Sequence, residues 1–279
     1  MLSYRHGFHA GNFADVLKHS LLCLAVTELL KKDKALAYID THSGAGMYSL
    51  TAPFAEKTGE YRAGIGRLWH DDTAPSLLQP YLHAIRAYNP DHQLRHYPGS
   101  PALVKALLRP GDLMQLSELH RNDFADLSTH FKATRHVQVA QEDGLQQLLK
   151  KLPPVSRRGL ILIDPSYELK NDYITVVKTL TSAYRRFATG VYCLWYPVLR
   201  RSETEQLLNA LAATGIRKQL RIEQCICQDN DATGMTGSGL LWINPPWQLA
   251  EQAQTILPWL QDKLGQHDGH WQVSWHVPE

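Results

Sequence analysis

The sequence predicts an α/β fold built on a mostly parallel sheet. Short apolar runs alternate along the chain with segments whose apolar residues recur at helical spacing, a pattern typical of parallel strands joined by helices. A glycine-rich loop also follows the first apolar run directly. The chain has 279 residues, of which 44% are hydrophobic and 20% charged. This composition supports a full hydrophobic core and excludes a mainly disordered chain.

The first predicted elements are a helix and a buried strand. Asn12 can cap a helix that carries Phe13, Val16 and Leu17 on one face. Residues 35–40 form a short apolar strand, and residues 41–46 form the glycine loop. A helix normally opens directly after such a loop, but here a segment with its own helical patterns intervenes. We therefore expect an inserted helical subdomain at 48–96, with a helix that starts at Pro75.

The alternation of strands and helices resumes after this segment. Ser100 is expected to cap a helix, with Pro101 in its first turn and a stop at Pro110. Further strands are expected at 113–117, 136–140, 159–163 and 190–195, with helices between them. A hairpin (219–227 and 240–244), a helix (249–264) and a strand (271–277) complete the chain. The main domain thus comprises 1–47 and 97–279.

Polar residues follow each of the first four main strands. His42 lies in the glycine loop, Glu118 follows the second strand, and Asp143 with Gly144 follows the third. The fourth strand runs into Asp164-Pro165-Ser166-Tyr167. Since ligands of open parallel sheets bind beyond the carboxyl ends of the strands, we expect these groups to meet in one crevice.

The crevice groups match the needs of a nucleoside. Glycine lets the backbone approach a ligand closely, and the helix at Ser100 offers N–H groups to an anion. Glu118 suits the paired hydroxyls of a ribose, and Asp143 can accept from an adenine amino group, although each could equally be an ordinary capping or solvated acid. A dinucleotide fingerprint would need a glycine where Ser49 stands. S-adenosylmethionine, which is converted to S-adenosylhomocysteine, is the cofactor that fits better.

The segment Asp164-Pro165-Ser166-Tyr167 resembles the [DNS]-P-P-[YFW] signature of methyltransferases that act on exocyclic amines, especially N6 of adenine. The Asp164 carboxylate and the Pro165 carbonyl can hold the two amine hydrogens, and Asp164 can take the released proton. Tyr167 can stack on the base. Ser166 replaces the second proline of the signature.

A second match to this signature lies near the end of the chain. Asn244-Pro245-Pro246-Trp247 fits it more literally. Its strand is the second arm of the predicted hairpin and should run antiparallel to the sheet, so its carboxyl end should point away from the crevice. We therefore assign the site to Asp164.

With these residues in place, the whole chain resembles the RlmJ family. The resemblance rests on LSYRHGFHAGNFADVLKH at the start, DTHSGAG, YPGSP, PPVSRRGLILIDPSYE, TGIRK and INPPW. It implies a Rossmann-like S-adenosylmethionine-dependent methyltransferase fold, with a seven-stranded type of sheet and an inserted helical subdomain. It also implies methylation of N6 of one adenine of 23S ribosomal RNA, adenine 2030.

The resemblance also assigns residues to roles. Residues 1–34 hold the N-terminal tail and a cofactor motif. The residues that it places at the cofactor are Lys18, His19, His42, Ser100, Glu118, Asp143, Gly144 and Asp164, with Asp164 as the proton acceptor. Tyr4 and His6 belong to the tail and lie near the target base, on the substrate side with Pro165 and Tyr167.

Composition limits the other possibilities. Fourteen histidines invite a metal, but no HExxH occurs and no cysteine cluster joins them, so we expect none. No signal peptide and no run of about 18 apolar residues occurs, which predicts a cytoplasmic protein without membrane contact. The expected partner is 23S RNA, either protein-free or in an early assembly intermediate, and the expected state is a monomer.

Arginine-rich pairs are candidate phosphate contacts. They are Arg157-Arg158, Arg185-Arg186, Arg200-Arg201 and Arg217-Lys218. Each pair alone is more often a solvated surface, but if several line one side of the crevice, affinity for a nucleic acid should fall steeply with salt. Three alternative functions remain open at this point: a DNA N6-adenine methyltransferase, a catalytically silent RNA-binding or ribosome-assembly module, and a nicotinamide-dependent oxidoreductase, which Ser49 argues against.

Overall fold

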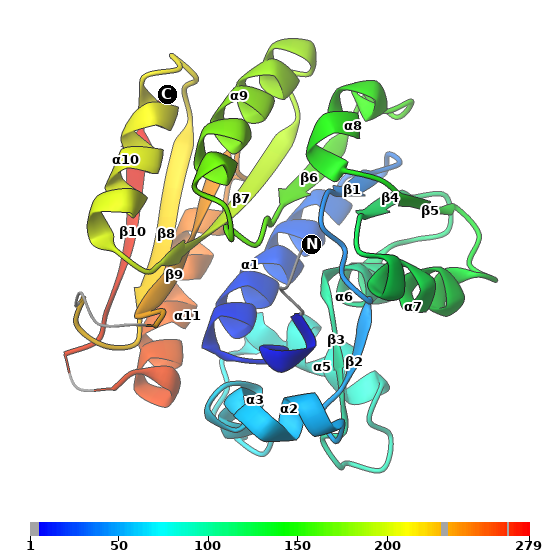
Figure 1. The fold of residues 1–279 in the computed structure, drawn as a ribbon, viewed down its shortest axis with the longest axis vertical. Helices are drawn as coiled ribbons and strands as arrows, with labels where there is room; N and C mark the ends of the chain where they lie inside the picture. Colours follow the sequence, from blue (N-terminus) through cyan, green and yellow to red (C-terminus); the bar gives the residue numbers. More distant parts are fainter. Residues whose placement is uncertain (1–5, 230–233, 267) are drawn as a thin grey trace.

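A computed structural model describes residues 6–229, 234–266 and 268–279 of the chain. A single eight-stranded sheet runs through the middle, with helices on both of its faces (Figure 1). In spatial order the strands are β10 (His270–Val277), β8 (Gln219–Cys225), β9 (Gly237–Ile243), β7 (Val191–Val198), β6 (Gly159–Ile163), β1 (Ala37–Asp40), β4 (Leu113–Glu118) and β5 (Val137–Gln141). The predicted α/β class is confirmed.

The sheet is parallel from β7 to β5, and β9 lies antiparallel between β7 and β8. The hairpin of β8 and β9 therefore has the predicted geometry. The final strand β10 pairs antiparallel with β8 and forms the edge of the sheet. The sheet is thus of the seven-stranded type with one added strand, which the sequence analysis found but did not place.

Helices cover both faces of the sheet. The helices α1 (Phe13–Leu30), α6 (Ser100–Leu107) and α11 (Leu249–Leu264) lie on one side, and α8 (Gly144–Lys151), α9 (Lys170–Arg186) and α10 (Arg201–Ala212) on the other. Along β6, Leu160 and Leu162 face the first group, whereas Ile161 and Ile163 face the second. Because both faces of this strand are covered, its sequence is a continuous apolar run.

A short turn and one further helix also belong to the main body. A 3-10 turn, η1 (His6–Phe8), precedes α1, and α7 (Arg121–Phe131) packs beside β5. None of the helices in the described ranges is long and apolar enough to cross a membrane.

Helix α1 is buried almost all round, because β9, α5, α6 and α11 surround it. It begins as predicted, since the Asn12 side chain accepts a hydrogen bond from the backbone N–H of Asp15 at 3.0 Å. Every residue from 14 to 26 is buried, including Asp15, Lys18 and His19. Polar side chains inside such a helix need partners, because burying an unpaired charge is costly.

The segment 48–96 is helical, as expected, and also contributes to a small second sheet. Its elements are α2 (Pro53–Thr58), α3 (Glu60–Ala63), α4 (Ile65–Leu68), η2 (Ser76–Leu78) and α5 (Gln79–Ala87). The antiparallel strands β2 (Met47–Ser49) and β3 (His96–Pro98) close the segment at its two ends, which the sequence analysis did not foresee. They return the chain to the sheet, so that α6 still connects β1 to β4.

Two details of the helix starts differ from prediction. Pro75 precedes the turn η2 instead of opening a helix, and α5 begins four residues later with Pro80 in its first turn. Gly99 rather than Ser100 caps α6, and Ser100 is its first helical residue. The reason is that the Ser100 hydroxyl is engaged elsewhere, as it donates to the Asp40 carboxylate at 2.7 Å.

The apolar side of the inserted segment joins the main core. Leu78, Tyr81 and Ile85 belong to the same buried cluster as α1 and one face of the sheet. The segment therefore packs on α1 through this face. The division into a main domain (1–47 and 97–279) and an inserted subdomain (48–96) remains our proposal.

Candidate active site

A cavity of about 960 Å³ opens at the carboxyl edge of the parallel strands. It collects residues from the glycine loop, from the ends of β4, β5, β6 and β7, and from α1. The predicted site residues that line it are His6, Lys18, His19, His42, Ser100, Glu118, Asp143, Gly144, Asp164 and Pro165. Tyr4 falls outside the described residues. The expected convergence of the strand ends is thus present in the fold.

Glu118 is fixed across the glycine loop. Its carboxylate accepts from the backbone N–H of Gly44 at 2.8 Å and from that of His120 at 2.7 Å. Gly44 has a φ of +58°, which favours glycine, and this conformation turns its N–H toward Glu118. Burial raises the pKa of Glu118 above its usual value, while both backbone donors oppose the shift. The carboxylate is held at the end of β4, where a ribose hydroxyl could donate to it.

Asp143 and Gly144 lie at the start of α8. One Asp143 oxygen accepts from the backbone N–H of Gln146 at 3.1 Å, so Asp143 caps the helix and still lines the cavity. A Cβ added to Gly144 would lie 2.0 Å from the carbonyl oxygen of Thr41. Only glycine therefore lets the start of α8 approach the glycine loop this closely.

Asp40, the last residue of β1, holds the glycine loop and the start of α6 in place through hydrogen bonds to its carboxylate. Its carboxylate accepts from the hydroxyls of Tyr38 and Ser100, each at 2.7 Å, and from the backbone N–H of His42 at 3.2 Å. Burial raises the pKa of Asp40 to about 6, and the pKa of His42 is lowered by burial as well. The sequence analysis treated Asp40 only as part of a strand. An acid that ends a wholly apolar strand was the available signal.

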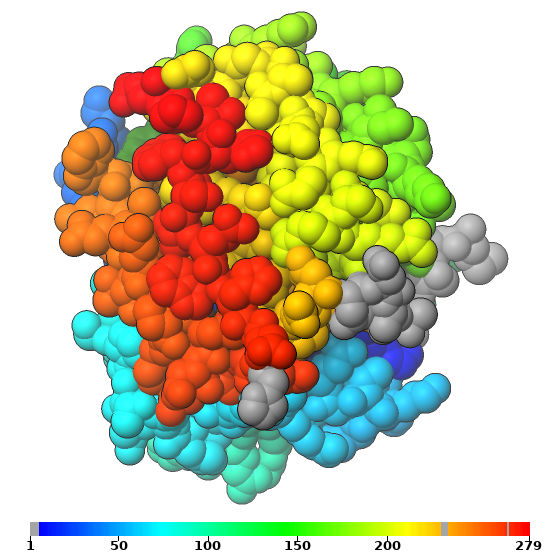
Figure 2. Space-filling model, turned by 90° about the vertical axis from the view of Figure 1, so that its left-hand side faces the viewer, coloured from blue at the N-terminus to red at the C-terminus, as the bar shows by residue number. Residues whose placement is uncertain are grey.

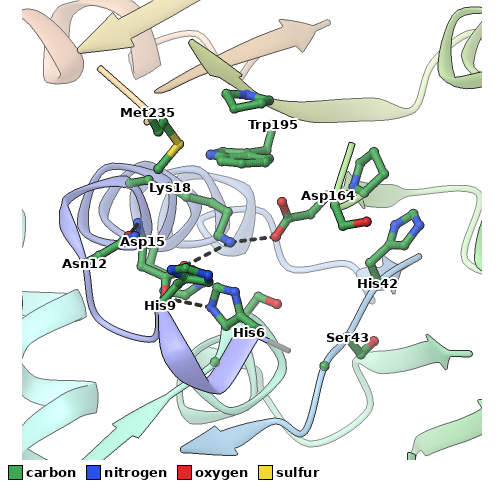
Figure 3. Close-up of a pocket in the computed structure, with 18 of the residues that line it drawn as sticks. His6, His9, Asn12, Asp15, Lys18, His42, Ser43, Asp164, Trp195 and Met235 are labelled. Carbon is green, nitrogen blue, oxygen red and sulfur yellow. Dashed lines mark hydrogen bonds and ion pairs between the residues drawn. The ribbon is translucent and has the colours of Figure 1, made fainter. Parts of the chain in front are cut away.

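A chain of charged groups runs from the N-terminal segment to Asp164 (Figure 3). The Lys18 ammonium lies 2.6 Å from Asp164 Oδ2 and 3.0 Å from Asp15 Oδ1. His6 Nε2 lies 2.9 Å from the other Asp15 oxygen. Burial alone would raise the pKa of Asp15, but the charges of His6 and Lys18 hold it well below its usual value. Asp15 is therefore a buried anion that fixes both His6 and Lys18.

Asp15 was missed in the sequence, where an acid in the first turn of a helix looks like an ordinary favourable charge. His19, its neighbour on α1, is likewise buried, and its Nδ1 lies 2.7 Å from the hydroxyl of Tyr97. Burial lowers the pKa of His19 to about 3. His19 is thus a neutral, hydrogen-bonded part of the cavity wall.

Tyr167 lies elsewhere than the sequence analysis expected. It is only 6% exposed, its hydroxyl donates to the backbone carbonyl of Trp195 at 2.9 Å, and its ring packs on Tyr173. It is not among the residues that line the cavity. The loop turns sharply here, with a φ of +53° at Tyr167, and this carries the ring into the core. This placement disagrees with the prediction that Tyr167 stacks on the target base.

Trp195, and not Tyr167, is the aromatic residue of this region that lines the cavity. Its ring lies beside Lys18, whose Nζ is 5.5 Å from the ring centroid, and close to Asp164 and Met235 (Figure 3). Its Nε1 is buried and has no hydrogen-bond partner among the described residues. Trp195 stands inside an apolar strand, where an aromatic residue normally indicates core, so the sequence gives no sign that it faces the cavity.

The second signature match lies at the opposite edge of the sheet. The Asn244 side chain donates to the carbonyls of Ala188 and Gly190, at 2.8 and 2.9 Å, which precede β7. Since β9 runs antiparallel to β7, its carboxyl end is remote from the cavity. Asn244 thus joins two loops and does not line the site.

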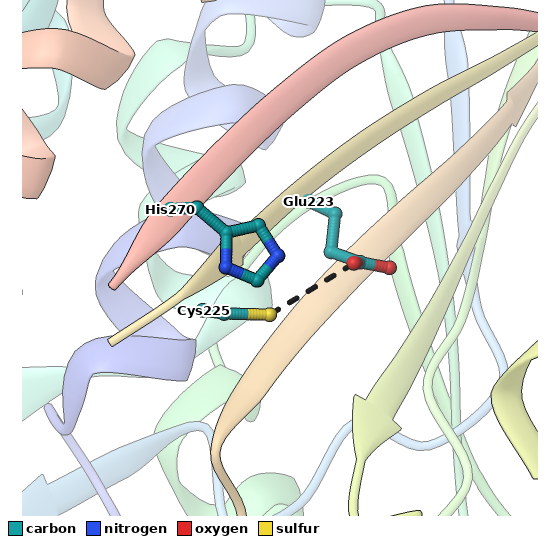
Figure 4. A group of neighbouring side chains, drawn as sticks. All are labelled: Glu223, Cys225 and His270. Carbon is teal, nitrogen blue, oxygen red and sulfur yellow. Dashed lines mark hydrogen bonds between the residues drawn. The ribbon is translucent and has the colours of Figure 1, made fainter. Parts of the chain in front are cut away.

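One cluster of side chains has the composition of a metal site (Figure 4). Glu223, Cys225 and His270 bring their donor atoms together at the end of β8. Arg221 and Arg201 already bind the Glu223 carboxylate at 2.8 and 2.7 Å, and their charges keep its pKa low despite burial. Burial also raises the pKa of the Cys225 thiol to about 12. A cation would have to displace two guanidinium groups and a thiol proton, so these residues do not fit a metal.

The cavity fits S-adenosylmethionine. Its volume is in the usual range for a cofactor site, and acids stand at the ends of β4 and β5 for the ribose and the adenine. The start of α6 and the glycine loop line the same cavity. The fold and the site together define a Rossmann-like, S-adenosylmethionine-dependent methyltransferase.

Comparison with known proteins identifies the family. The family model described as "Ribosomal RNA large subunit methyltransferase D, RlmJ" matches residues 33–277. The chain is 52% identical to the protein named ribosomal RNA large subunit methyltransferase J of Escherichia coli K12, and 48% identical to the Haemophilus influenzae protein of the same name, with all of each chain covered. A crystal structure of a Legionella pneumophila protein is 38% identical, with a TM-score of 0.90 over 96% of this chain and 98% of that one. The chain belongs to the RlmJ family.

Proposed function

We propose that the protein transfers a methyl group from S-adenosylmethionine to N6 of one adenine of 23S ribosomal RNA, adenine 2030. The observation that carries the proposal is the Asp164–Lys18 ion pair in the cavity, in which Asp164 is the first residue of the segment that resembles an amine-methyltransferase signature. The relatives in Escherichia coli and Haemophilus influenzae are named as methyltransferases of large-subunit ribosomal RNA, which agrees with this substrate.

The residues of the cavity divide between cofactor and substrate. We infer that Glu118, Asp143 and Gly144 hold the adenosine part of the cofactor, and that His19, His42 and Ser100 line the remainder. When bound, S-adenosylmethionine supplies an electrophilic methyl group and is released as S-adenosylhomocysteine. Lys18 and Asp164 stand where the cofactor and the target base meet.

Asp164 is the proposed proton acceptor. Lys18 occupies its Oδ2, and Oδ1 forms no hydrogen bond within the described ranges. Oδ1 and the Pro165 carbonyl can therefore accept the two N–H bonds of the adenine amine, which aims the nitrogen lone pair at the methyl carbon. As positive charge develops on nitrogen, a proton passes to Asp164. Lys18 keeps the carboxylate oriented before this transfer.

We assign the contact with the target base to Trp195 in place of Tyr167. Its ring lines the cavity, where it can stack on a base that has left its own stack. His6, fixed by Asp15, lies beside this region, and Tyr4 is proposed to join it. The target adenine must leave its stack to enter, so protein-free RNA or an early assembly intermediate is the proposed substrate. We further propose that the enzyme acts as a monomer in the cytoplasm.

Label transfer from S-adenosylmethionine tests this function. Protein-free 23S RNA, intact ribosomal subunits and duplex DNA are offered to the natural protein and to Asp164→Ala. We expect N6-methyladenine at one position of protein-free RNA, with no product from the variant. Transfer to DNA alone would indicate the DNA enzyme, and RNA binding without transfer would indicate a silent module. Sedimentation of the same sample measures the oligomeric state.

A further inference from the structure

The arginine pairs of the sequence do not gather at the cavity. Arg157-Arg158 precedes β6, Arg185-Arg186 precedes β7, and Arg217-Lys218 precedes β8. All three therefore lie at the amino-terminal edge of the parallel strands, opposite the cavity. Only Arg200-Arg201, which follows β7, lies at the cavity edge. Three of the four pairs are therefore not placed to contact RNA at the cavity.

Contacts join the loops at this opposite edge into one surface. Arg158 Nη1 donates to the carbonyl of Lys34 at 2.9 Å and so links the loop before β6 to the loop before β1. Arg186 Nε donates to the carbonyl of Leu152 at 2.6 Å, which links the end of α9 to the loop before β6. In Figure 1, α1 and α9 both end toward this edge, at the top of the view.

Several cations on these loops have no anionic partner. Lys32, Lys34, Arg157, Arg185 and Arg186 form no ion pair with any residue that the structure describes, and all five are exposed. The nearby acids each have a cationic partner, since Glu28 pairs with Lys31 at 2.7 Å, and Asp112 and the exposed Asp33 pair with Arg109 at 3.2 and 3.9 Å. The net charge of the chain is only +2, so this excess of positive charge is local.

An exposed tryptophan stands among these cations. Trp247 is 96% exposed. Its loop is held between the cationic loops, because Asn244 donates to the carbonyls before β7 and Lys31 donates to the side chain of Gln248 at 3.1 Å. Figure 2 shows this orange segment beside the blue loop that follows α1, at the upper left. The Pro-Pro-Trp match that the catalytic site does not use thus presents an aromatic ring beside positive charge.

We propose that this basic face, made of Lys32, Lys34, Arg157, Arg185, Arg186 and Trp247, is a second RNA-binding surface. The lysines and arginines contact phosphates, and the Trp247 ring stacks on an unpaired base. The face is separated from the cavity by at least the length of β6, roughly 17 Å for five residues. An RNA that reaches both is therefore longer than the few nucleotides around the target adenine. This proposal rests on the proposed RNA substrate and adds a part of that RNA remote from the target adenine.

Helix polarity offers a competing reason for these cations. The helices α1, α8 and α9 end at this edge, and positive side chains near helix carboxyl ends stabilise them. If that is their only role, removing these cations would lower the melting temperature and leave RNA affinity unchanged. The two explanations therefore predict effects on different measurements.

The test compares two double variants that each lose two positive charges. Lys34→Gln with Arg157→Gln alters the basic face, and Lys57→Gln with Arg86→Gln alters helices of the inserted segment, away from that face. Affinity for a long 23S RNA fragment is measured against salt concentration. We expect the first variant to lower the slope of log affinity against log salt by about 1.5, and the affinity at 0.15 M salt by roughly tenfold. The control variant should match the natural protein.

A second comparison tests the contribution of the Trp247 ring and the dependence of binding on RNA length. Trp247→Ala should weaken binding of the long fragment by about fivefold or more, whereas Trp275→Ala, at a half-exposed position on β10, should not. Methylation of a short RNA that carries the target adenine but does not reach the basic face should be unchanged in all four variants. Equal salt slopes and affinities for the altered and control proteins, or a lower melting temperature alone, would overturn the proposal. Failure of the natural protein to methylate any RNA would instead refute the proposed function, and RNA binding by the basic face would remain measurable.

Discussion

Removing the Lys18 charge should separate its two roles, which are the stability of α1 and the orientation of Asp164. Lys18→Met leaves two carboxylates without their shared cation. The side chain of Asp15 is 2% exposed and that of Asp164 is 15% exposed, so water can reach Asp164 more easily than Asp15. Breaking a buried ion pair costs about 3–5 kcal/mol, and the remaining contact of Asp15 with His6 places this variant near 3 kcal/mol. For a chain of this size the melting temperature should fall by roughly 6–12 °C.

A paired variant distinguishes instability from lost chemistry. Lys18→Met combined with Asp15→Asn removes the stranded buried charge, so the melting temperature should recover to within a few degrees of the natural protein. Asp164 would still lack its cation, and kcat should stay lower by about 100-fold in both variants. Calorimetry and single-turnover methyl transfer measure the two effects. A kcat within twofold of the natural value for either variant would refute the proposed role of Lys18.

Further predictions concern Ser166 in the loop after β6, the buried Asp40, the second signature match at Asn244, and the effect of a metal chelator. Ser166→Pro should preserve or raise kcat, because the backbone N–H of Ser166 donates no hydrogen bond within the described residues, and a large loss would show that the loop is misplaced. The raised pKa of Asp40, about 6 against 3.8, means that its contribution to stability is complete below pH 3.8 and is lost as pH rises through 6, by roughly 3 kcal/mol. Asp40→Asn should flatten this change in denaturant titrations at pH 4 and pH 7.5, and an unaltered pH profile would contradict it. Asn244→Ala should lower stability and leave kcat unchanged, whereas loss of methyl transfer would move the active site to Asn244. A metal chelator should leave methyl transfer unaffected, and loss that added zinc restores would contradict the assignment.

The strand ends could be read from the sequence because local signals determine them. An apolar run such as 159–163 is buried on both faces, and the first polar residues after it must lie at the carboxyl edge of the sheet. Parallel strands then bring Glu118, Asp143 and Asp164 together, whatever lies between them in the chain. The helix starts were less certain, since Ser100 and Gly99 are both good caps and only the contact with Asp40 distinguishes them.

The contacts that the sequence did not reveal join distant parts of the chain. Lys18 and Asp164 are 146 residues apart, and no spacing predicts their contact. The orientation of Tyr167 depends on one left-handed residue in a loop, and that of Trp195 on which face of β7 meets the cavity. The polar residues Asp15, Lys18 and His19 inside an otherwise apolar helix were a signal that could have indicated a functional site.

A crystal structure of the protein with S-adenosylhomocysteine and adenosine tests the central claim most directly. We expect the cofactor product beneath the glycine loop, with its ribose at Glu118. The N6 amine of the adenosine should lie within hydrogen-bond distance of Asp164 Oδ1 and the Pro165 carbonyl. A cofactor at another edge of the sheet, or an amine beyond the reach of Asp164, would contradict the account.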